Sequence, residues 1–174
     1  MSEENDRMTG KTVRDSQVQL SQWMGVQDAN LAGFVHGGVI MRLVDAAAGL
    51  AAIKHARGSV VTAAIDEMSF IEPVNLGDLV TVKASVNFVG TTSMEVGVRV
   101  ETENPVTGSR SHTSTAYLVF VAVDETSRRP RPVPRLIAET PDEKRRSREA
   151  RLRREARLAR RQAILEGRAA EHDG

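Results

Sequence analysis

Asn30, Gly37, Gly38 and Asp45 have the types and the spacing needed to attack an acyl carbon. Asn30 opens a polar, glycine-rich stretch that leads through Gly37 and Gly38 into an apolar helical segment, and Asp45 lies seven residues after Gly38. That spacing is nearly two helical turns, so Gly38 and Asp45 fall on one line about 10 Å apart along the axis. An amide, free backbone N–H groups and a carboxylate are the groups that hydrolyse an acyl compound.

Each of these residues also has a purely structural interpretation. Asp45 acts as a general base or a nucleophile in the functional interpretation. In the structural one it pairs with Arg42, three residues earlier on a solvent-exposed helix face. Asn30 either orients a carbonyl or a water, or caps a turn through its own backbone. Gly37 and Gly38 either stabilise developing negative charge or only turn the chain into the helix.

Histidine and cysteine content narrows the chemistry further. His36 lies directly before the glycines and either donates to a bound group or caps the helix. His55 and His112 have no acidic neighbour at ligand spacing, so no metal site is expected. Because the chain has no cysteine, disulfides and thiolate catalysis are excluded.

One helix and five strands are expected around these residues. Residues 39–56 are apolar or small almost all round, which predicts an enclosed helix. Alternating or continuous apolar patterns predict strands at residues 13–24, 60–70, 79–89, 94–101 and 111–123. Short turns between the later strands favour antiparallel pairing. The pattern predicts an α+β fold, a sheet curled round a helix, whose apolar edges favour a homo-oligomer.

Composition and the termini set further limits. The 174 residues allow one ordinary domain plus extensions, and a net charge of +1 argues against a strongly charged partner such as nucleic acid. Residues 1–12 are expected to be a flexible N-terminus with no secretory signal. No apolar run approaches the ~20 residues of a membrane span, so a cytoplasmic location is expected.

The C-terminal third differs in character from the rest. Residues 126–141 are predicted to be a proline-rich linker, and residues 142–174 an Arg-rich helical tail. From residue 142 to residue 168 there are 11 basic and 5 acidic side chains. Such a helix either holds phosphates or is simply solvated, and without aromatic residues it does not suit single-stranded nucleic acid.

Several short motifs recur here in a characteristic order and spacing. They are Asp28-Ala29-Asn30, Gly33, Val35-His36-Gly37-Gly38, Asp45, Val61-Thr62-Ala63, Phe70, Pro73, Gly77-Asp78, Ser93-Met94-Glu95, Pro132-Val133-Pro134, Glu139-Thr140 and Asp142-Glu143-Lys144. Over about residues 13–146 the chain resembles the cytosolic acyl-CoA thioesterases of the hotdog fold, which include the brain-type acyl-CoA hydrolase of animals and small bacterial acyl-CoA hydrolases. Trp23-Met24-Gly25-Val26 departs from the pattern, because relatives often have a proline there.

The resemblance implies a hotdog domain at residues 13–125, paired as a homodimer and assembled as a trimer of dimers. It implies hydrolysis of fatty acyl-CoA to free fatty acid and CoA, with no metal and no cofactor, since CoA is part of the substrate. The catalytic pair would be Asn30 and Asp45, facing each other across the dimer. Substrate would be bound by His36, Gly37, Gly38 and Thr62, and CoA by Ser93, Arg110, Lys144 and Arg145.

Two other classes of function fit the same fold. A non-catalytic acyl-CoA-binding sensor would bind the thioester without turnover and use its basic tail for another partner. A hotdog dehydratase or hydratase would place a histidine with the acid, and His36 is the nearby candidate.

Overall fold

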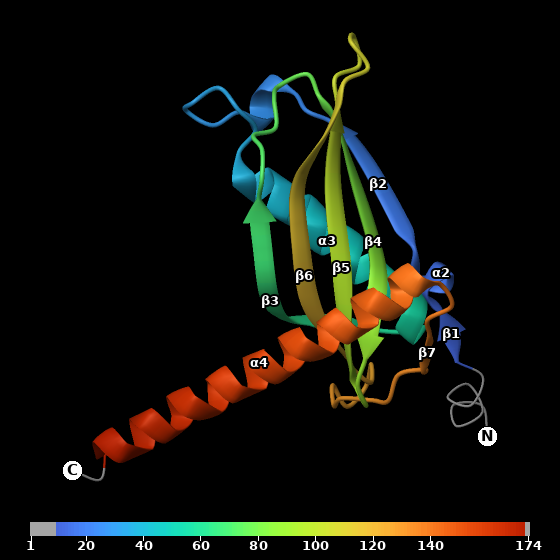
Figure 1. Ribbon diagram of the computed structural model, residues 1–174, viewed down its shortest axis with the longest axis vertical. Helices are drawn as coiled ribbons and strands as arrows, with labels where there is room; N and C mark the ends of the chain where they lie inside the picture. Colours follow the sequence, from blue (N-terminus) through green and yellow to red (C-terminus); the bar gives the residue numbers. More distant parts are fainter. Residues whose placement is uncertain (1–9, 173–174) are drawn as a thin grey trace.

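A long helix lies across a curved antiparallel sheet in the computed structural model, which describes residues 10–172 (Figure 1). The helix is α3, Gly37–Ala56, and the strands are β2 (Val18–Trp23), β3 (Val60–Phe70), β4 (Leu79–Val89), β5 (Ser93–Glu103) and β6 (Arg110–Ala122). The strands pair in the order β2-β4-β5-β6-β3, all antiparallel. The expected α+β fold, a sheet curled round one helix, is confirmed.

The prediction of a first strand at residues 13–24 is wrong for its first four residues. Residues Val13–Ser16 form a short helix, α2, and β2 begins only at Val18. A capping box causes this, because the Asp15 carboxylate accepts from the Thr12 N–H (2.8 Å) while the Thr12 hydroxyl accepts from the Asp15 N–H (3.3 Å). The Ser16 hydroxyl then holds this turn against β4 by accepting a hydrogen bond from the Val86 N–H.

Small residues on α3 let the helix lie close against the sheet. Its buried side chains are mostly alanines, and Phe120 of β6 fills the space beside Gly49. The helix is not enclosed on all sides, however. Leu50, which an enclosed helix would bury, is 44% exposed, and the exposures of Met41 and Ile53 are similar (42% and 44%). A single sheet covers one side of a helix, so the opposite side of α3 stays open in one chain.

The strand β3 continues this open surface. It pairs with β6 on one side, and no strand of residues 10–172 pairs with its other side. Val61, Ile65 and Phe70 on this edge strand are each about half exposed (46%, 46% and 53%). An apolar edge of this kind is normally covered by another element or another chain.

The segment at residues 126–141 packs against the end of α3. Val133 is buried in the core, and β7 (Leu136–Ile137) pairs in parallel with β1 (Lys11–Thr12). The short helix η1, Val26–Asp28, precedes the Asn30 loop. Of the N-terminal residues 1–12, only residues 10–12 lie within the described part.

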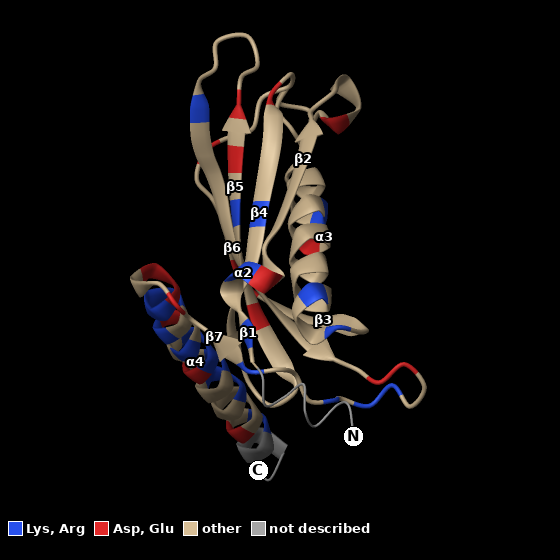
Figure 2. Cartoon of the chain, turned by 90° about the vertical axis from the view of Figure 1, so that its right-hand side faces the viewer, with Lys and Arg blue, Asp and Glu red and all other residues tan. Residues whose placement is uncertain are grey.

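The last helix, α4 (Pro141–His172), crosses the outer face of the sheet, away from α3 (Figure 2). Its first half is not simply solvated. Ala150 is fully buried, and Arg153 and Arg157 form ion pairs with carboxylates of the sheet. None of the helices in residues 10–172 is long and apolar enough to cross a membrane.

His55, in the last turn of α3, is a fully buried link to the C-terminal segment. Its Nε2 donates to the Pro134 carbonyl oxygen (3.0 Å), since a carbonyl only accepts. Its Nδ1 is buried and has no hydrogen-bond partner in the described part of the chain. A second proton would therefore sit on a nitrogen without an acceptor. Burial lowers the pKa of His55 below its usual value, against the partial opposing effect of the Pro134 carbonyl.

We expect the free energy of unfolding to decrease as the pH falls below about 6.5, the pKa of an unfolded histidine. The unfolded chain then binds a proton that folded His55 does not, and the decrease ends only below the lowered pKa of the folded state. Urea unfolding at fixed protein concentration, from about pH 8 to about pH 5, measures the effect. His55→Gln keeps a donor for Pro134 and should lose this part of the pH dependence. An unchanged slope in that variant would contradict the assignment.

Candidate active site

The start of α3 is capped by the residue that precedes it. His36 is the N-cap, and its Nδ1 accepts from the Gly38 N–H at 2.9 Å. A Cβ on residue 38 would lie 3.0 Å from that nitrogen, so glycine keeps the cap in place. The Gly38 N–H is therefore engaged by His36 in this structure. The Gly37 N–H lies in the first turn, where N–H groups have no partner within the helix, and it makes no hydrogen bond among the described residues.

Asn30 is held by its own loop. Its Oδ1 accepts from the backbone N–H groups of Ala32 (2.9 Å) and Phe34 (3.1 Å), so the turn-capping role is present. Because both partners are donors, the amide oxygen faces the loop and the Nδ2 group, which carries two hydrogens, faces away from it. The cap thus orients Asn30 as a hydrogen-bond donor.

Asp45 lies on the open side of α3, where its Oδ1 accepts from the Thr62 hydroxyl on β3 at 3.0 Å. No ion pair joins it to Arg42 among the described residues. The alternative in which Asp45 forms a salt bridge with Arg42 is therefore wrong. Thr62 fixes one carboxylate oxygen, and within residues 10–172 the other oxygen has no hydrogen bond or ion pair.

The hollow that Asn30 borders does not include Asp45. Asn30 borders a hollow of about 330 Å³ with Phe34, Gly37 and Phe70, and Asp45 is not among its lining residues. Gly37 and Asp45 are eight residues apart on α3, which separates them by about 12 Å along the axis. A site that contains both Asn30 and Asp45 would therefore need residues from a second chain.

The four side chains expected to bind CoA lie apart in a single chain. Ser93 begins β5, and Arg110 begins β6 near the opposite end of the sheet, paired with Glu103 at 2.7 Å (Figure 1). Lys144 and Arg145 are in the first turns of α4, and Arg145 is already bound to Asp142 and Glu149.

Two hollows were not anticipated from the sequence. Phe34 and Phe70 border the one beside Asn30, and spacing alone gives no signal for a cavity between a loop and a strand end. The larger one, about 610 Å³, lies between the start of α4 and the outer face of the sheet, away from the face of α3 that bears Asp45. In the described part of the chain, His, Asp and Glu form no group that could hold a metal ion.

Comparison with known proteins identifies the family. The thioesterase superfamily matches residues 32–109. A cytosolic acyl coenzyme A thioester hydrolase of Mus musculus is 36% identical over 157 residues, which are 89% of this chain but only 41% of the relative. An uncharacterized acyl-CoA thioester hydrolase of Bacillus subtilis (strain 168) is 40% identical over 67% of each chain.

Solved structures agree with the sequence comparison. An apo-hexameric acyl-CoA thioesterase is 39% identical, with a TM-score of 0.83 over 86% of this chain and 96% of its own. The acyl-CoA hydrolase of Staphylococcus aureus in complex with butyryl-CoA and CoA is 33% identical, with a TM-score of 0.83 over 93% and 97% of the two chains. The chain belongs to the hotdog acyl-CoA thioesterases of the thioesterase superfamily.

Alanine variants of the S. aureus enzyme provide a further comparison. An Asn, an Asp and a Thr were each replaced there, and intervals of 15 and 17 residues separate the three positions. Asn30, Asp45 and Thr62 are separated by the same two intervals in this chain. The match concerns residue type and spacing.

Thr62→Val should release the Asp45 carboxylate, because valine keeps the shape of threonine but has no hydroxyl donor. Hydrolysis of an acyl-CoA, the reaction that names the relatives, should fall roughly tenfold to hundredfold, since a hydrogen bond to a charged group contributes about 1.5–3 kcal/mol. Thr62→Ser keeps the donor and should stay close to wild type. Thiol release and thermal unfolding of both variants measure this. Equal rates in the valine and serine variants would show that the bond has no catalytic part.

Proposed function

We propose that this protein hydrolyses acyl-CoA thioesters to a free fatty acid and CoA. The observation that carries the proposal is the Asp45 carboxylate held by Thr62 on the open side of α3, with Asn30 oriented as a donor at the helix start. Membership of the family and the butyryl-CoA complex of the S. aureus relative support acyl-CoA as the substrate. The chain spans 41% of the mouse relative, so the activity proposed is that of this chain alone.

In the proposed mechanism the thioester carbonyl lies at the start of α3. The Gly37 N–H and the Asn30 Nδ2 group donate to the oxygen as it becomes negative, and one such donor contributes on the order of 10²–10³ in rate. The free oxygen of Asp45 takes a proton from water, whose oxygen bonds to the carbonyl carbon. The carbon–sulfur bond then breaks and CoA leaves as a thiolate, which needs no strong acid. Direct attack by Asp45 through an anhydride uses the same groups.

Each active site is proposed to be shared between two chains. Asn30 borders a hollow with Phe70 of β3, and Asp45 contacts Thr62 of β3 outside that hollow, so both residues lie beside the open surface formed by α3 and β3. Pairing two copies along β3 would cover the apolar side chains of that surface and bring Asp45 towards Asn30 of the partner subunit. Three such dimers are proposed to assemble into a hexamer, because a similar solved structure is hexameric.

The remaining assignments are proposals of the same kind. Residues 13–125 would form the catalytic domain, followed by the segments 126–141 and 142–174. His36 would position the Gly37–Gly38 turn beside the thioester, while Ser93, Arg110, Lys144 and Arg145 would contact CoA from neighbouring chains, because in one chain they lie apart. No metal or cofactor takes part in the proposed reaction. A cytosolic location is proposed because the mouse relative is a cytosolic enzyme.

Asp45→Asn should abolish hydrolysis while the fold is kept, because asparagine is nearly isosteric but does not accept the proton. Thiol release from acyl-CoAs of several chain lengths, measured with thermal stability, tests this. Arg42→Ala, one turn earlier on the helix, is the matched control and should keep near-normal turnover. A wild-type chain that binds acyl-CoA without releasing thiol would instead be a sensor, and product with an altered acyl chain would indicate a dehydratase or hydratase.

Mixed dimers should recover activity from two inactive variants. When Asn30→Ala and Asp45→Ala chains are co-expressed in equal amounts, about half of the dimers are mixed by random pairing. One site of a mixed dimer then holds both substitutions and the other holds neither. Activity should return to about a quarter of wild type. Absence of recovery in isolated mixed dimers would mean that both residues act within one chain.

A further inference from the structure

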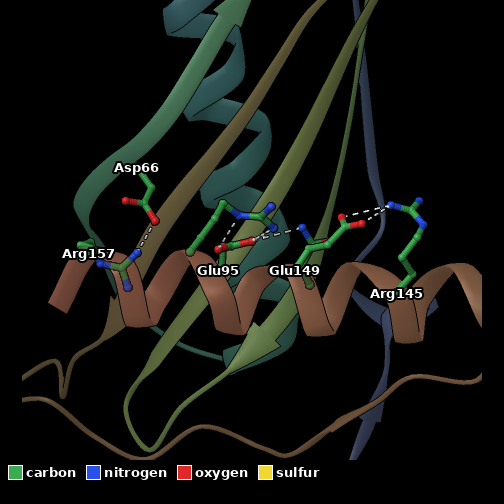
Figure 3. A network of polar contacts seen from close by, with 7 residues as sticks. Asp66, Glu95, Arg145, Glu149 and Arg157 are labelled. Atoms are coloured by element: carbon green, nitrogen blue, oxygen red, sulfur yellow. Dashed lines mark hydrogen bonds and ion pairs between the residues drawn. The ribbon is translucent and has the colours of Figure 1, made fainter. Parts of the chain in front are cut away.

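The helix α4 is anchored to the outer face of the sheet by a stripe of arginines. Arg153 donates to both oxygens of Glu95 on β5 (2.7 and 3.2 Å) and lies 3.6 Å from the ring centre of Tyr117 on β6. One turn later Arg157 pairs with Asp66 on the edge strand β3 (Figure 3). Both carboxylates are almost fully buried, at 4% and 7% exposure. Successive arginines on one helix face thus meet successive strands towards the open edge.

The same stripe continues beyond that edge. At 3.6 residues per turn, the positions that follow Arg157 on this face are Arg161, Ile164 and Arg168. All three are exposed, and neither arginine has an ion pair among the described residues. From residue 158 to residue 172 the helix extends about 22 Å. Figure 1 shows this part of α4 projecting past β3, where no other described element of the chain lies against it.

A second copy of the chain is the occupant that fits. Two chains paired along β3 by a two-fold axis perpendicular to the sheet present their outer faces on the same side. The projecting part of α4 would then lie over the partner. Glu67 is exposed and opposite Tyr117 in register, so it belongs to the outer face on which α4 lies. It has no ion pair in the described part of the chain, and neither has the exposed Glu72 that follows β3.

We propose that residues 158–168 of α4 bind the outer face of a second copy of this chain, with Arg161 paired to the partner's Glu67. The inference rests on the proposed pairing along β3. Unpaired arginines on the projecting helix then meet unpaired carboxylates at the neighbouring edge, as Arg157 meets Asp66 within the chain. The contact would hold together the two chains that supply Asn30 and Asp45 to each site.

Cross-linking between two distinguishable chains tests the contact, and the absence of natural cysteine makes the result specific. A tagged chain with Glu67→Cys is co-expressed with an untagged chain with Arg161→Cys, and a short thiol-specific cross-linker is added. The matched control replaces Arg161→Cys by Ala159→Cys, two residues earlier and on the opposite side of the helix. We expect the tagged–untagged product with Arg161→Cys and little of it with Ala159→Cys.

Charge reversal gives a second, independent measurement. Arg161→Glu should raise the dissociation constant of the paired chains about tenfold, and adding Glu67→Arg should reverse most of that rise. The turnover of assembled enzyme should stay unchanged, because neither residue belongs to the proposed active site. Sedimentation over a range of protein concentrations and thiol release from the same samples provide both values.

The outcomes separate this inference from the proposed function. A paired, active enzyme with no selective cross-link and no response to Arg161→Glu would overturn the docking of α4 and leave the thioesterase in place. Unpaired chains without thiol release would overturn both. If Arg161→Glu instead abolished binding to duplex DNA or to vesicles of anionic lipid while the pairing constant stayed the same, the projecting helix would serve that ligand and the proposal would be wrong.

Discussion

A single curved sheet covers only one side of the helix it wraps. In this chain the covered side of α3 is packed with alanines against the valines of the sheet, and the uncovered side carries Met41, Asp45 and Leu50. The edge strand β3 lies beside that side with its own half-exposed apolar residues. We propose that a second chain covers this surface and encloses the carboxylate on it. Assembly and chemistry would then depend on the same open face.

Local hydrogen bonds prepare the site before any partner arrives. His36 caps α3 and holds the Gly38 N–H, the Asn30 loop fixes which side of the amide faces outward, and Thr62 holds one oxygen of Asp45. A group whose position is fixed in advance needs little reorganisation when the transition state forms. Because the Gly38 N–H already donates to His36, the proposed mechanism assigns the developing negative charge to the Gly37 N–H and the Asn30 amide.

The C-terminal part of the chain stabilises the fold from two directions. Residues near Pro134 close the end of α3 through His55, and α4 closes the outer face of the sheet through Arg153 and Arg157. Buried carboxylates such as Glu95 and Asp66 are costly without partners. Removing α4 after Ser147 would therefore do more than shorten a solvated tail, because both arginines lie beyond that residue.

The sequence by itself determined the regular secondary structure of this protein. A mostly apolar run predicted β3 and alternation predicted β4, both at their observed bounds. Helical periodicity predicted α3 to within two residues, and the motifs around Asn30 and Asp45 indicated the family. These features depend on neighbours in the chain, so spacing reveals them. The α2 turn escaped prediction because a Thr12–Asp15 cap outweighed a strand-like pattern. Only the tertiary structure decided which face of α3 is open, that Asp45 is bound to Thr62 and not to Arg42, and that α4 packs on the sheet. Each of these depends on a contact between residues far apart in the sequence, and no local period encodes such a contact.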